Sequence, residues 1–360
     1  MRNARPIADV PPFLVDEIGQ RDAVVARIWQ RAPKVDQAAA FPADDFADLA
    51  ASGMLDVDGL LDSRALPVLA AIGSASLTVG RLFEGHLNAV KLVRRFGGAA
   101  AVAIVAAEAA AGRIAGVWNA ERGPGVRATR HRGGFRLSGS KVHCSGAGSV
   151  RRPVVTAHVD DGVLMLLPDL ADPAVRIDLS VWRASGMRGT ATGSVTFDGV
   201  EVPDTAVIGG PGDYYRSPWF SGGAWRVLAV QLGGLDRIMA LHAERLRLDD
   251  AVARARFADA AAAHESARLL VSEASRRAED TAGEAADIDA YVDLARTAFE
   301  AAALVVIGAT RRNVGLSTFI APDPLDRVLR DLETYLRQPF LDASRDHAAR
   351  WLAARGGRFR

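Results

Sequence analysis

The order in which hydrophobic periodicity changes along the chain limits the folds open to it. Apolar residues recur at helical spacing up to about Gly112, in short alternating runs up to about Ile208, and at helical spacing again from Trp219 to the end. Helical spacing indicates amphipathic helices, and alternation indicates half-buried strands. We therefore expect three consecutive domains, α, then β, then α, at residues 1–112, 113–213 and 214–360.

The two helical blocks carry patterns of different length. In the first block, helical patterns cover residues 42–55, 66–79 and 99–111, and Gly53 stands where the first of them would end. In the third block, residues 288–308 combine one apolar stripe with a charged face, and we expect the stripe to face the core of a bundle. The stripe consists of Tyr291, Ala295, Ala298, Ala302 and Val305, and the charged face consists of Asp289, Asp293, Arg296 and Glu300.

The middle block consists of short runs rich in Val, Phe, Thr and Leu. Asp160-Asp161-Gly162 separates VVTAHV from VLMLL, and Asp198-Gly199 separates SVTF from VEV. Both are the pattern of two strands joined by a turn. Six or so such strands in about 95 residues predict a small antiparallel barrel or sandwich.

Composition excludes several classes of protein. The chain is 49% apolar and 24% charged with a net charge of +1, which is typical of a folded globular protein without a nucleic-acid partner. It has no run of about 20 strongly apolar residues, so we expect no membrane span. The first 13 residues lack an apolar h-region, so we expect a cytoplasmic protein. One cysteine and no ligand-like histidine spacing predict neither a disulfide nor a metal site.

Arginine dominates the basic residues, because only three of the 44 are lysines. One explanation is a GC-rich genome, which also raises the share of Ala and Gly. The other is phosphate recognition, for which the planar guanidinium is well suited. Composition leaves both explanations open.

Four motifs lie along the chain in a fixed order. They are GGFRLSGSKVHCSGAG at 133–148, WRASGMRGTATGSVTFDGVEVP at 182–203, Arg254-Ala-Arg-Phe257, and Gly315 followed by PLDRVLRD at 324–331. In sequence and in order they resemble motifs of the acyl-CoA dehydrogenase family. The resemblance implies an α+β fold with an N-terminal α-helical domain, a middle antiparallel β-barrel and a C-terminal four-helix bundle. It also implies an FAD-dependent flavoprotein that forms a homotetramer or homodimer.

The resemblance implies that the flavin ring lies against two loops of the β domain, at 117–121 and 143–145. The polar edge of the ring needs amides and a hydroxyl such as that of Ser145, and one face needs an aromatic wall. Trp182 or Trp118 would be that wall, with core packing as the alternative for each. For Cys144, a packed core position is the alternative to a redox role. The implied ring-binding residues are Trp118, Asn119, Glu121, Cys144, Ser145, Trp182 and Thr192.

The resemblance also implies contacts to the FAD phosphates across a subunit interface. Arg254 stands at the motif position that pairs with the pyrophosphate, and Phe257 follows at the motif spacing. A bidentate guanidinium contact suits a phosphate, although a solvated helix face is the alternative. Arg312 stands where the family carries a Gln for the ADP of the neighbouring subunit.

The catalytic carboxylate of the family is missing. Dehydrogenation of an acyl-CoA needs a Glu to remove the α-proton. The commoner family position, nine residues after Arg330, is Pro339, and the other position, near residues 225–228, has no carboxylate either. Trp182 ahead of the Gly-Met-Arg turn and the stretch RDLETYLRQP at 330–339 also resemble the reduced-flavin monooxygenase branch of the fold. The resemblance implies a site that needs no such base but a dry pocket with a His or Ser near the flavin. His143 and Ser145 are the candidates, and a solvent-facing strand residue is the alternative for His143.

The sequence therefore predicts an FAD-dependent oxidoreductase that acts by α,β-dehydrogenation of an acyl-CoA or related acyl thioester. An electron-transfer flavoprotein or a paralogue that carries the Glu is the protein partner this implies. Two alternatives stay open. One is a flavin-dependent monooxygenase of the same fold, and the other is a catalytically idle flavoprotein subunit that a partner completes.

Overall fold

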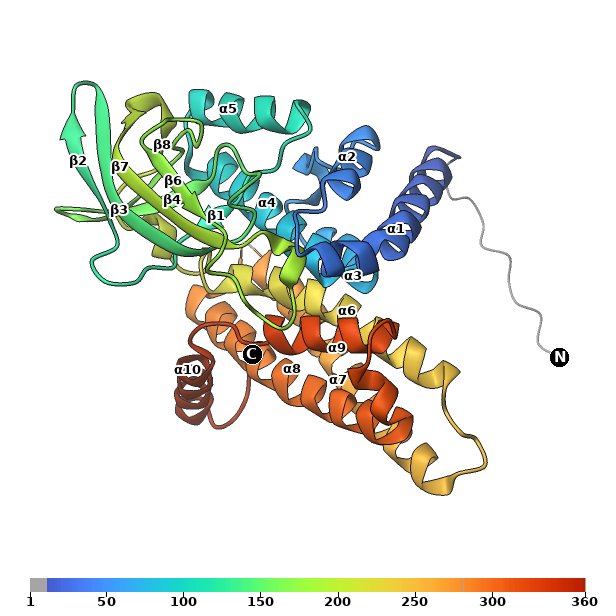
Figure 1. Ribbon diagram of the computed structural model, residues 1–360. Coiled ribbons are helices and arrows are strands. Elements are labelled where there is room, and N and C mark those ends of the chain that lie inside the picture. The colour runs from blue at the N-terminus through green and yellow to red at the C-terminus, as the bar shows by residue number, and fades with distance from the viewer. Residues whose placement is uncertain (1–11, 281, 360) are drawn as a thin grey trace.

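The first block of the chain is helical. The computed structural model describes residues 12–280 and 282–359, so most of the N-terminal segment used to argue against a secretion signal lies outside them. The helices are α1 (Pro12–Ala38), α2 (Ala43–Ala51), α3 (Ala65–Ala75), α4 (Leu77–Phe96) and α5 (Ala99–Ala110) (Figure 1). Gly53 follows α2 at φ +75°, as expected of a helix end. The pattern over residues 66–79 is split at Ser76, whose hydroxyl accepts the Val79 N–H and starts α4.

The middle block is a sheet of eight strands in the order β6-β7-β3-β2-β4-β5-β8, with β1 beside β4. Most pairs are antiparallel, and β4 pairs in parallel with β1 and β2. The hairpin predicted at Asp160-Asp161-Gly162 is present as β4 and β5. Asp198-Gly199 is not a turn, because Gly199 is a bulge inside β7. The strands are β1 (Val117–Trp118), β2 (Val126–His131), β3 (Gly134–Cys144), β4 (Val154–Val159), β5 (Gly162–Leu166), β6 (Val175–Asp178), β7 (Gly193–Pro203) and β8 (Val207–Ile208).

The sheet is open, so the expected closed barrel is wrong in this respect. Closure would require the edge strands β6 and β8 to pair with each other, and within the described residues they do not. Strand β8 instead meets the end of α4, where Ile208 bridges to Gly97 and the Gly209 N–H donates to the Phe96 carbonyl at 2.9 Å. This contact covers a sheet edge and fixes α4 against the β domain.

The third block is a helical bundle beneath the sheet (Figure 1). It contains α6 (Trp225–Glu244), α7 (Ala251–Ala278), α8 (Ala285–Val314), α9 (Pro324–Tyr335) and α10 (Leu341–Ala354). The stripe predicted on α8 is only partly right, because Val305 is 46% exposed while Asp289 and Asp293 are buried. Helices α6, α7 and α10 pack around α8, so more than one face of this helix is covered.

Two tight contacts join the third block to the first and to the middle block. Helices α3 and α6 cross so tightly that a Cβ on Gly233 would lie 1.9 Å from the Ala70 carbonyl oxygen. The Gly-Met-Arg-Gly turn of the β domain rests on α9, where the Asp331 carboxylate accepts the Met187 N–H at 2.5 Å. Burial raises the pKa of Asp331 to about 6. The motifs at 182–203 and 324–331 therefore hold each other across the domain boundary.

Among the helices that the structure describes, none combines the length and apolar character needed to cross a bilayer. The described residues also contain no group of three or more His, Cys, Asp or Glu side chains that could hold a metal ion.

Candidate functional site

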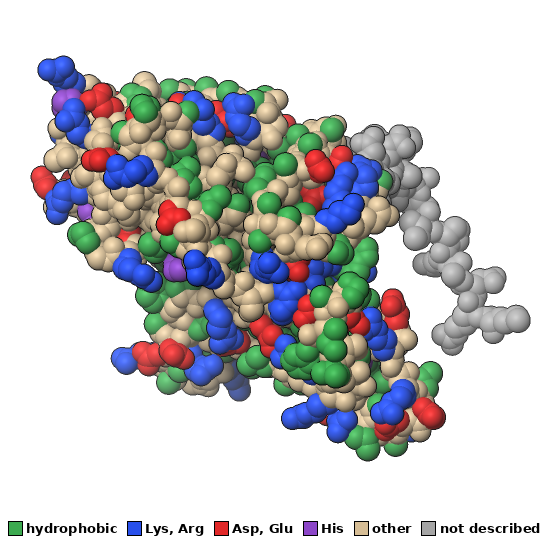
Figure 2. Space-filling view, in the orientation of Figure 1, with side chains coloured by type: hydrophobic (Ala, Val, Ile, Leu, Met, Phe, Trp, Pro, Cys, Tyr) green, Lys and Arg blue, Asp and Glu red, His purple; other side chains and the backbone are tan. Residues whose placement is uncertain are grey.

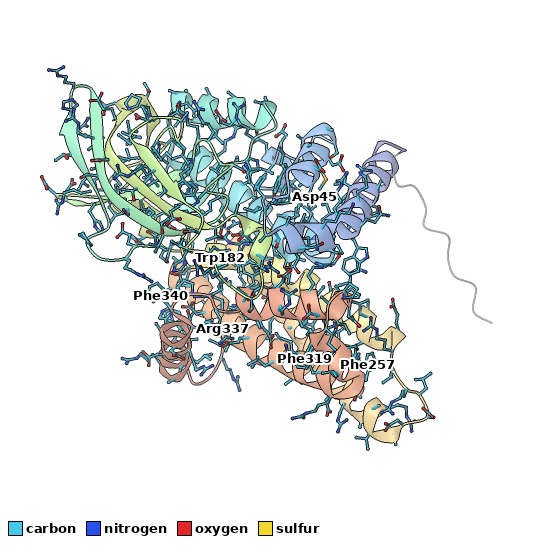
Figure 3. The ribbon with its side chains drawn as sticks, viewed as in Figure 1. Asp45, Trp182, Phe257, Phe319, Arg337 and Phe340 are labelled. Carbon is cyan, nitrogen blue, oxygen red and sulfur yellow. The ribbon has the colours of Figure 1, made fainter. Side chains whose placement is uncertain are left out.

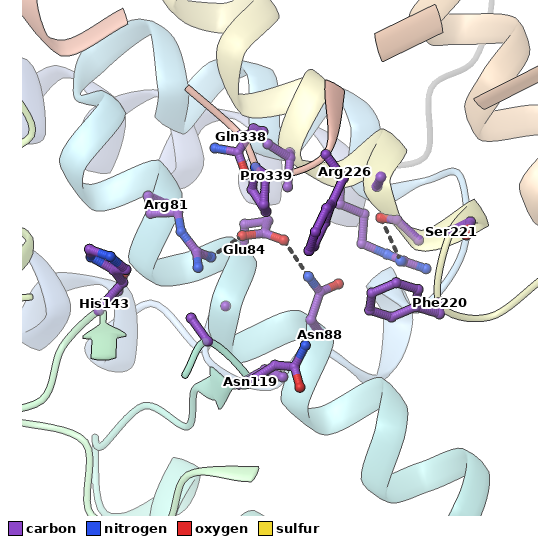
Figure 4. A pocket seen from close by; sticks show the side chains of 18 of the residues that line it. Arg81, Glu84, Asn88, Asn119, His143, Phe220, Ser221, Arg226, Gln338 and Pro339 are labelled. Carbon is purple, nitrogen blue, oxygen red and sulfur yellow. Dashed lines mark hydrogen bonds and ion pairs between the residues drawn. The ribbon is translucent and has the colours of Figure 1, made fainter. Parts of the chain in front are cut away.

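One cavity of about 1500 Å³ lies where the three blocks meet. Its walls are the long face of α4, the loops after β1 and β3, the segment leading into α6, and the chain between α9 and α10 (Figure 4). A pocket for a single drug-sized ligand has about 300–1000 Å³. The cavity is therefore large enough for a flavin together with a second small molecule.

The two loops expected to bind the flavin form one wall. The Trp118 ring is buried, and its Nε1–H donates to the Ser145 carbonyl at 3.1 Å, which ties the loops together. The hydroxyl oxygens of Thr190 and Thr192 are 2.7 Å apart, and the Thr192 hydroxyl is 3.5 Å from that of Ser145. This wall offers a row of small hydroxyl groups to a ligand.

Trp182 and His143 line the cavity side by side. Their ring centroids are 6.4 Å apart in an edge-to-face arrangement, and the Trp182 Nε1–H donates to the Met187 carbonyl at 3.0 Å. His143 has φ +54°, a left-handed conformation that is uncommon for a residue with a side chain. The imidazole is exposed and lines the cavity, so a catalytic role for His143 stays a prediction.

Asn119 presents its amide nitrogen to the cavity because its oxygen is already used. Lys141, a donor only, is fully buried and donates to the Thr156 hydroxyl at 2.8 Å. The Thr156 hydroxyl then donates to Asn119 Oδ1 at 2.8 Å, and the Tyr215 hydroxyl donates to the same oxygen at 3.0 Å. Both acceptor positions of the oxygen are filled, which leaves the Asn119 NH₂ group as a donor for a ligand.

Glu121 is a structural neighbour of this chain of hydrogen bonds. Its carboxylate accepts Lys141 Nζ, His158 Nε2 at 2.8 Å and the Val126 N–H at 3.2 Å. Burial would raise the pKa of Glu121, but these donors outweigh it and lower the pKa below its usual value. Glu121 therefore fixes the loop that carries Asn119 and is held as a carboxylate.

Helix α4 places a row of polar side chains along the side that faces the cavity. Arg81, Glu84, Asn88, Lys91 and Arg95 follow one another at helical spacing. Glu84 is 1% exposed and accepts hydrogen bonds from both Arg81 and Asn88 (Figure 4). These contacts hold a buried carboxylate near the centre of the cavity.

Two tyrosines border the same region. The Tyr335 hydroxyl is buried without a hydrogen-bond partner in the described part of the chain, although the residue lines the cavity. Burial raises the pKa values of Tyr214 and Tyr335 above their usual range, so both remain neutral donors.

A partly buried charge cluster lies farther along α4. Lys91 Nζ donates to Glu279 Oε1 at 2.6 Å and to the Leu61 carbonyl at 2.7 Å, and Arg226 Nη2 donates to Glu279 Oε1 at 2.8 Å. Burial and the nearby Arg226 lower the pKa of Lys91 to about 8. Two cations thus share one carboxylate.

The missing dehydrogenase base is not supplied at either family position. Pro339 lines the cavity, and its carbonyl accepts Arg296 Nη2 at 2.8 Å. The other position is occupied by the buried Trp225 and by Arg226, which adds positive charge there. Glu84 enters the cavity from a different domain.

The structure brings together most of the residues expected to bind the flavin ring. Trp118, Asn119, Glu121, Ser145, Trp182 and Thr192 all line the cavity. Cys144 does not line it. The Cys144 side chain is fully buried, and burial raises the pKa of its thiol to about 12, which favours the packed core interpretation.

The residues expected to contact the FAD phosphates lie elsewhere. Arg254 Nη1 donates to the Leu248 carbonyl at 2.5 Å, Phe257 packs edge-to-face on His242, and Arg312 is exposed. Figure 3 places Phe257 at the end of the bundle opposite Phe340, away from the cavity. The implied contact runs to a neighbouring subunit, so these roles stay predictions.

Sequence reasoning missed the cavity residues that lie outside both the four motifs and the loop at 117–121. Those from α4 were detectable, because polar residues at helical spacing interrupt a helix whose other faces are apolar and buried. Tyr335 and Arg226 gave no such signal. They belong to helices whose sequence shows only that a helix is present. The missed residues are Arg81, Glu84, Asn88, Lys91, Arg95, Tyr214, Arg226, Glu279 and Tyr335.

Comparisons with known proteins identify the fold. No protein family model matches the chain, and no curated protein matches it. Solved structures match over nearly the whole length. TdsC of a Paenibacillus species, a dibenzothiophene monooxygenase solved with FMN and indole, has a TM-score of 0.82, 19% identity and coverage of 96% of this chain and 98% of its own.

Two further matches have comparable values. Methanesulfinate monooxygenase MsuC of Pseudomonas fluorescens has a TM-score of 0.81, 18% identity and coverage of 96% of this chain and 98% of its own. KijD3, solved with FMN and a dTDP-linked amino sugar, has a TM-score of 0.81, 20% identity and coverage of 98% of this chain and 96% of its own. At this level of identity the likeness establishes the fold, which the chain shares with flavin-binding enzymes.

Proposed function

We propose that the chain is a monooxygenase that uses reduced FMN and dioxygen to oxygenate a small molecule. The observation that carries this proposal is one cavity with a flavin-type wall, room for a second ligand, and no carboxylate at either place where a dehydrogenase of this fold needs one. The monooxygenases of the same fold support it. We propose FMN in place of the expected FAD because the similar structures hold FMN.

The residues present fit a flavin ring. The Asn119 NH₂ group and the Ser145 hydroxyl are donors suited to the oxygen-bearing edge of the ring, and Trp182 is the aromatic neighbour. A reduced flavin bound there would supply the two electrons that activate dioxygen, so that one oxygen atom would enter the substrate and the other would leave as water. The protein would hold the ring edge through Asn119, exclude water through buried walls, and offer Tyr335 as an unpaired neutral donor.

A dehydrogenase that uses Glu84 as its base is the second candidate, because this carboxylate lies in the cavity. Arg81 donates to one carboxylate oxygen of Glu84, and Asn88 donates to the other. Both oxygens are therefore already engaged by neighbours on α4. The geometry therefore favours a positioning role for Glu84 over proton abstraction.

A direct test compares the two reactions on one preparation. Under anaerobic conditions, butyryl-, hexanoyl- and octanoyl-CoA are added to the protein with oxidised FMN or FAD, and the flavin absorbance is followed. In parallel, the protein is mixed with oxygen, indole and FMN reduced by an added reductase, and products are identified by mass spectrometry. We expect no bleaching by acyl-CoA and an oxygenated product in the second reaction. Bleaching at catalytic rates would refute the proposal.

We also propose that copies of the chain associate and complete the flavin site. Hydrophobic side chains gather on the outer end of the bundle (Figure 2), where Leu316, Phe319 and Ile320 are more than half exposed. Association would bring Arg254 and Arg312 of one copy toward the flavin of another. Replacing both by Ala should then weaken FMN binding about tenfold in fluorescence titrations, and unchanged binding would remove these roles.

A further inference from the structure

The cavity carries more positive than negative charge, and the excess is confined to one end. Elsewhere in the cavity each charged side chain has an opposite partner. The pairs are Glu121 with Lys141, Asp293 with Arg296, Glu333 with Arg311, Arg337 with Glu300, and Glu84 with Arg81. These residues contribute no net charge to the cavity.

The remaining charged residues are Lys91, Arg95, Arg226 and Glu279. Lys91 and Arg226 share Glu279, so one of the two cations lacks a carboxylate of its own. The Arg226 side chain is 4% exposed, and its Nε is buried without a hydrogen-bond partner in the described part of the chain. Like charges in a buried site raise its energy unless an anion joins them.

Arg95 adds a second unmatched cation. Its guanidinium lies 3.9 Å from the centroid of the Trp219 ring, and among the described residues no carboxylate lies within ion-pair distance of it. Arg95 and Trp219 both line the cavity. The end formed by Lys91, Arg95 and Arg226, which we call the cationic end, therefore has an excess of two positive charges and an aromatic wall.

We infer that the substrate carries an anionic group, such as a carboxylate or a sulfonate, that binds at the cationic end while its apolar part extends toward the flavin wall. Calling the bound molecule a substrate rests on the proposed oxygenation. The inference that an anion binds at the cationic end rests only on the charges of the residues there. An anion there would balance the shared cation and give Arg95 a partner, and charge-assisted hydrogen bonds are the stronger ones.

The phosphate of FMN is the other anion that this end would attract. Three observations favour the substrate. The cationic end is built by α4, the first turn of α6, the C-cap of α7 and the segment before α6 that carries Trp219, and it receives no residue from the two flavin loops. Arg226 lies on the opposite side of Glu84 from His143, which borders the flavin wall (Figure 4). Arg95 is 11 residues beyond Glu84 on α4, about 16 Å along the helix.

The test uses two ligands of the same shape, 2-naphthoate and 2-naphthamide, of which only the first is an anion. Their affinities for the full chain are measured by calorimetry without flavin and again with saturating FMN. The variants are Arg95→Gln and Lys91→Met, and the matched control is Arg94→Gln. Arg94 is the neighbouring arginine, but it faces Asp58 outside the cavity. Lys91→Met leaves Arg226 and Glu279 as a balanced pair, and the exposed Arg95 tolerates replacement without loss of the fold.

We expect naphthoate to bind at least tenfold more tightly than naphthamide, with and without FMN. Arg95→Gln and Lys91→Met should each weaken naphthoate three- to tenfold and leave naphthamide unchanged, and Arg94→Gln should change neither. Equal affinity of the two ligands would overturn the inference, as would equal losses in Arg94→Gln and Arg95→Gln. A loss of preference for FMN over riboflavin in Arg95→Gln, with naphthoate unaffected, would assign the site to the flavin phosphate. Because binding is measured without turnover, failure of the oxygenation would leave this result interpretable.

Discussion

Replacing Thr156 by Val tests the chain of hydrogen bonds that orients Asn119. Thr156 is 1% exposed and stands between Lys141 and Asn119, with 2.8 Å to each. Valine has nearly the same shape but neither accepts nor donates. The substitution therefore removes two hydrogen bonds without opening a cavity, and it leaves one donor of the buried Lys141 unpaired.

The expected cost follows from these two losses. A neutral hydrogen bond contributes about 1 kcal/mol, and a buried donor left without a partner costs about 1–3 kcal/mol. We expect the free energy of unfolding to fall by about 2–4 kcal/mol in urea titrations followed by circular dichroism. Asn119 would keep only the Tyr215 hydroxyl on its oxygen, so its amide would be less well oriented. We therefore expect FMN to bind about three- to tenfold more weakly.

Thr156→Ser is the matched control, because serine keeps the hydroxyl and loses one buried methyl group. Its cost should be about 1 kcal/mol, from lost apolar burial alone, and its affinity for FMN should equal that of the parent chain. If the Val variant were as stable as the Ser variant, Lys141 would have another acceptor and the reasoning would fail. Equal FMN affinity in both variants would show that the Asn119 amide does not contact the flavin.

Three further predictions concern packing, a buried thiol and a titrating amine. Gly186→Ala should lower the free energy of unfolding by at least about 2 kcal/mol in the same urea titrations, because a Cβ would lie 2.0 Å from the Arg330 carbonyl oxygen. Gly308→Ala is the control, because its Cβ would meet open space, and it should raise the free energy of unfolding by about 0.5–1 kcal/mol. Cys144 should resist alkylation by N-ethylmaleimide at pH 8 until the chain unfolds, since its pKa is raised to about 12; rapid native-state labelling would contradict its burial. The affinity for naphthoate should fall as the pH rises through about 8, where Lys91 loses its proton, and Lys91→Met should show no such dependence.

The parts of the fold that sequence predicts are those set by local rules. The change from helix to strand and back follows from the hydrophobic period, and the hairpin at Asp160-Asp161-Gly162 follows from turn chemistry. The errors arise where a nonlocal contact decides. Gly199 has the sequence of a turn but lies in a bulge because β7 continues to pair with β3, and the sheet stays open because β8 meets α4.

The α8 stripe shows the same limit within a single helix. A helix that is surrounded on several sides has no single buried face, so periodicity alone misplaces its core. Asp293 is buried because Arg296 and His347 satisfy its carboxylate, whereas Val305 lies on a side of the helix that no described residue fully covers. The stripe would be correct only for a helix packed against one neighbour.

In the candidate site, too, sequence predicts the residues that belong to motifs and misses most of the others. Asp331 accepts the Met187 N–H across the domain boundary, and Lys141 holds the Thr156 hydroxyl and the Asn119 carbonyl. These motif residues build the frame of the cavity that we propose as a flavin site, and none of them needs to act on a substrate. A sequence that keeps them therefore predicts the pocket but not the reaction. This is why the resemblance points to an acyl-CoA dehydrogenase although the base that such an enzyme needs is missing.

The chemistry of the site instead depends on side chains that no motif contains. Glu84 and Lys91 come from α4, and Arg226 comes from α6. These two helices pack against each other and line the cavity. The buried Glu84 carboxylate is paired with Arg81, and the Glu279 carboxylate is shared by Lys91 and Arg226. A site with this charge distribution is poorly suited to remove a proton as a free carboxylate would. It is well suited to hold an anion beside the proposed flavin site, and the naphthoate and naphthamide pair measures this property.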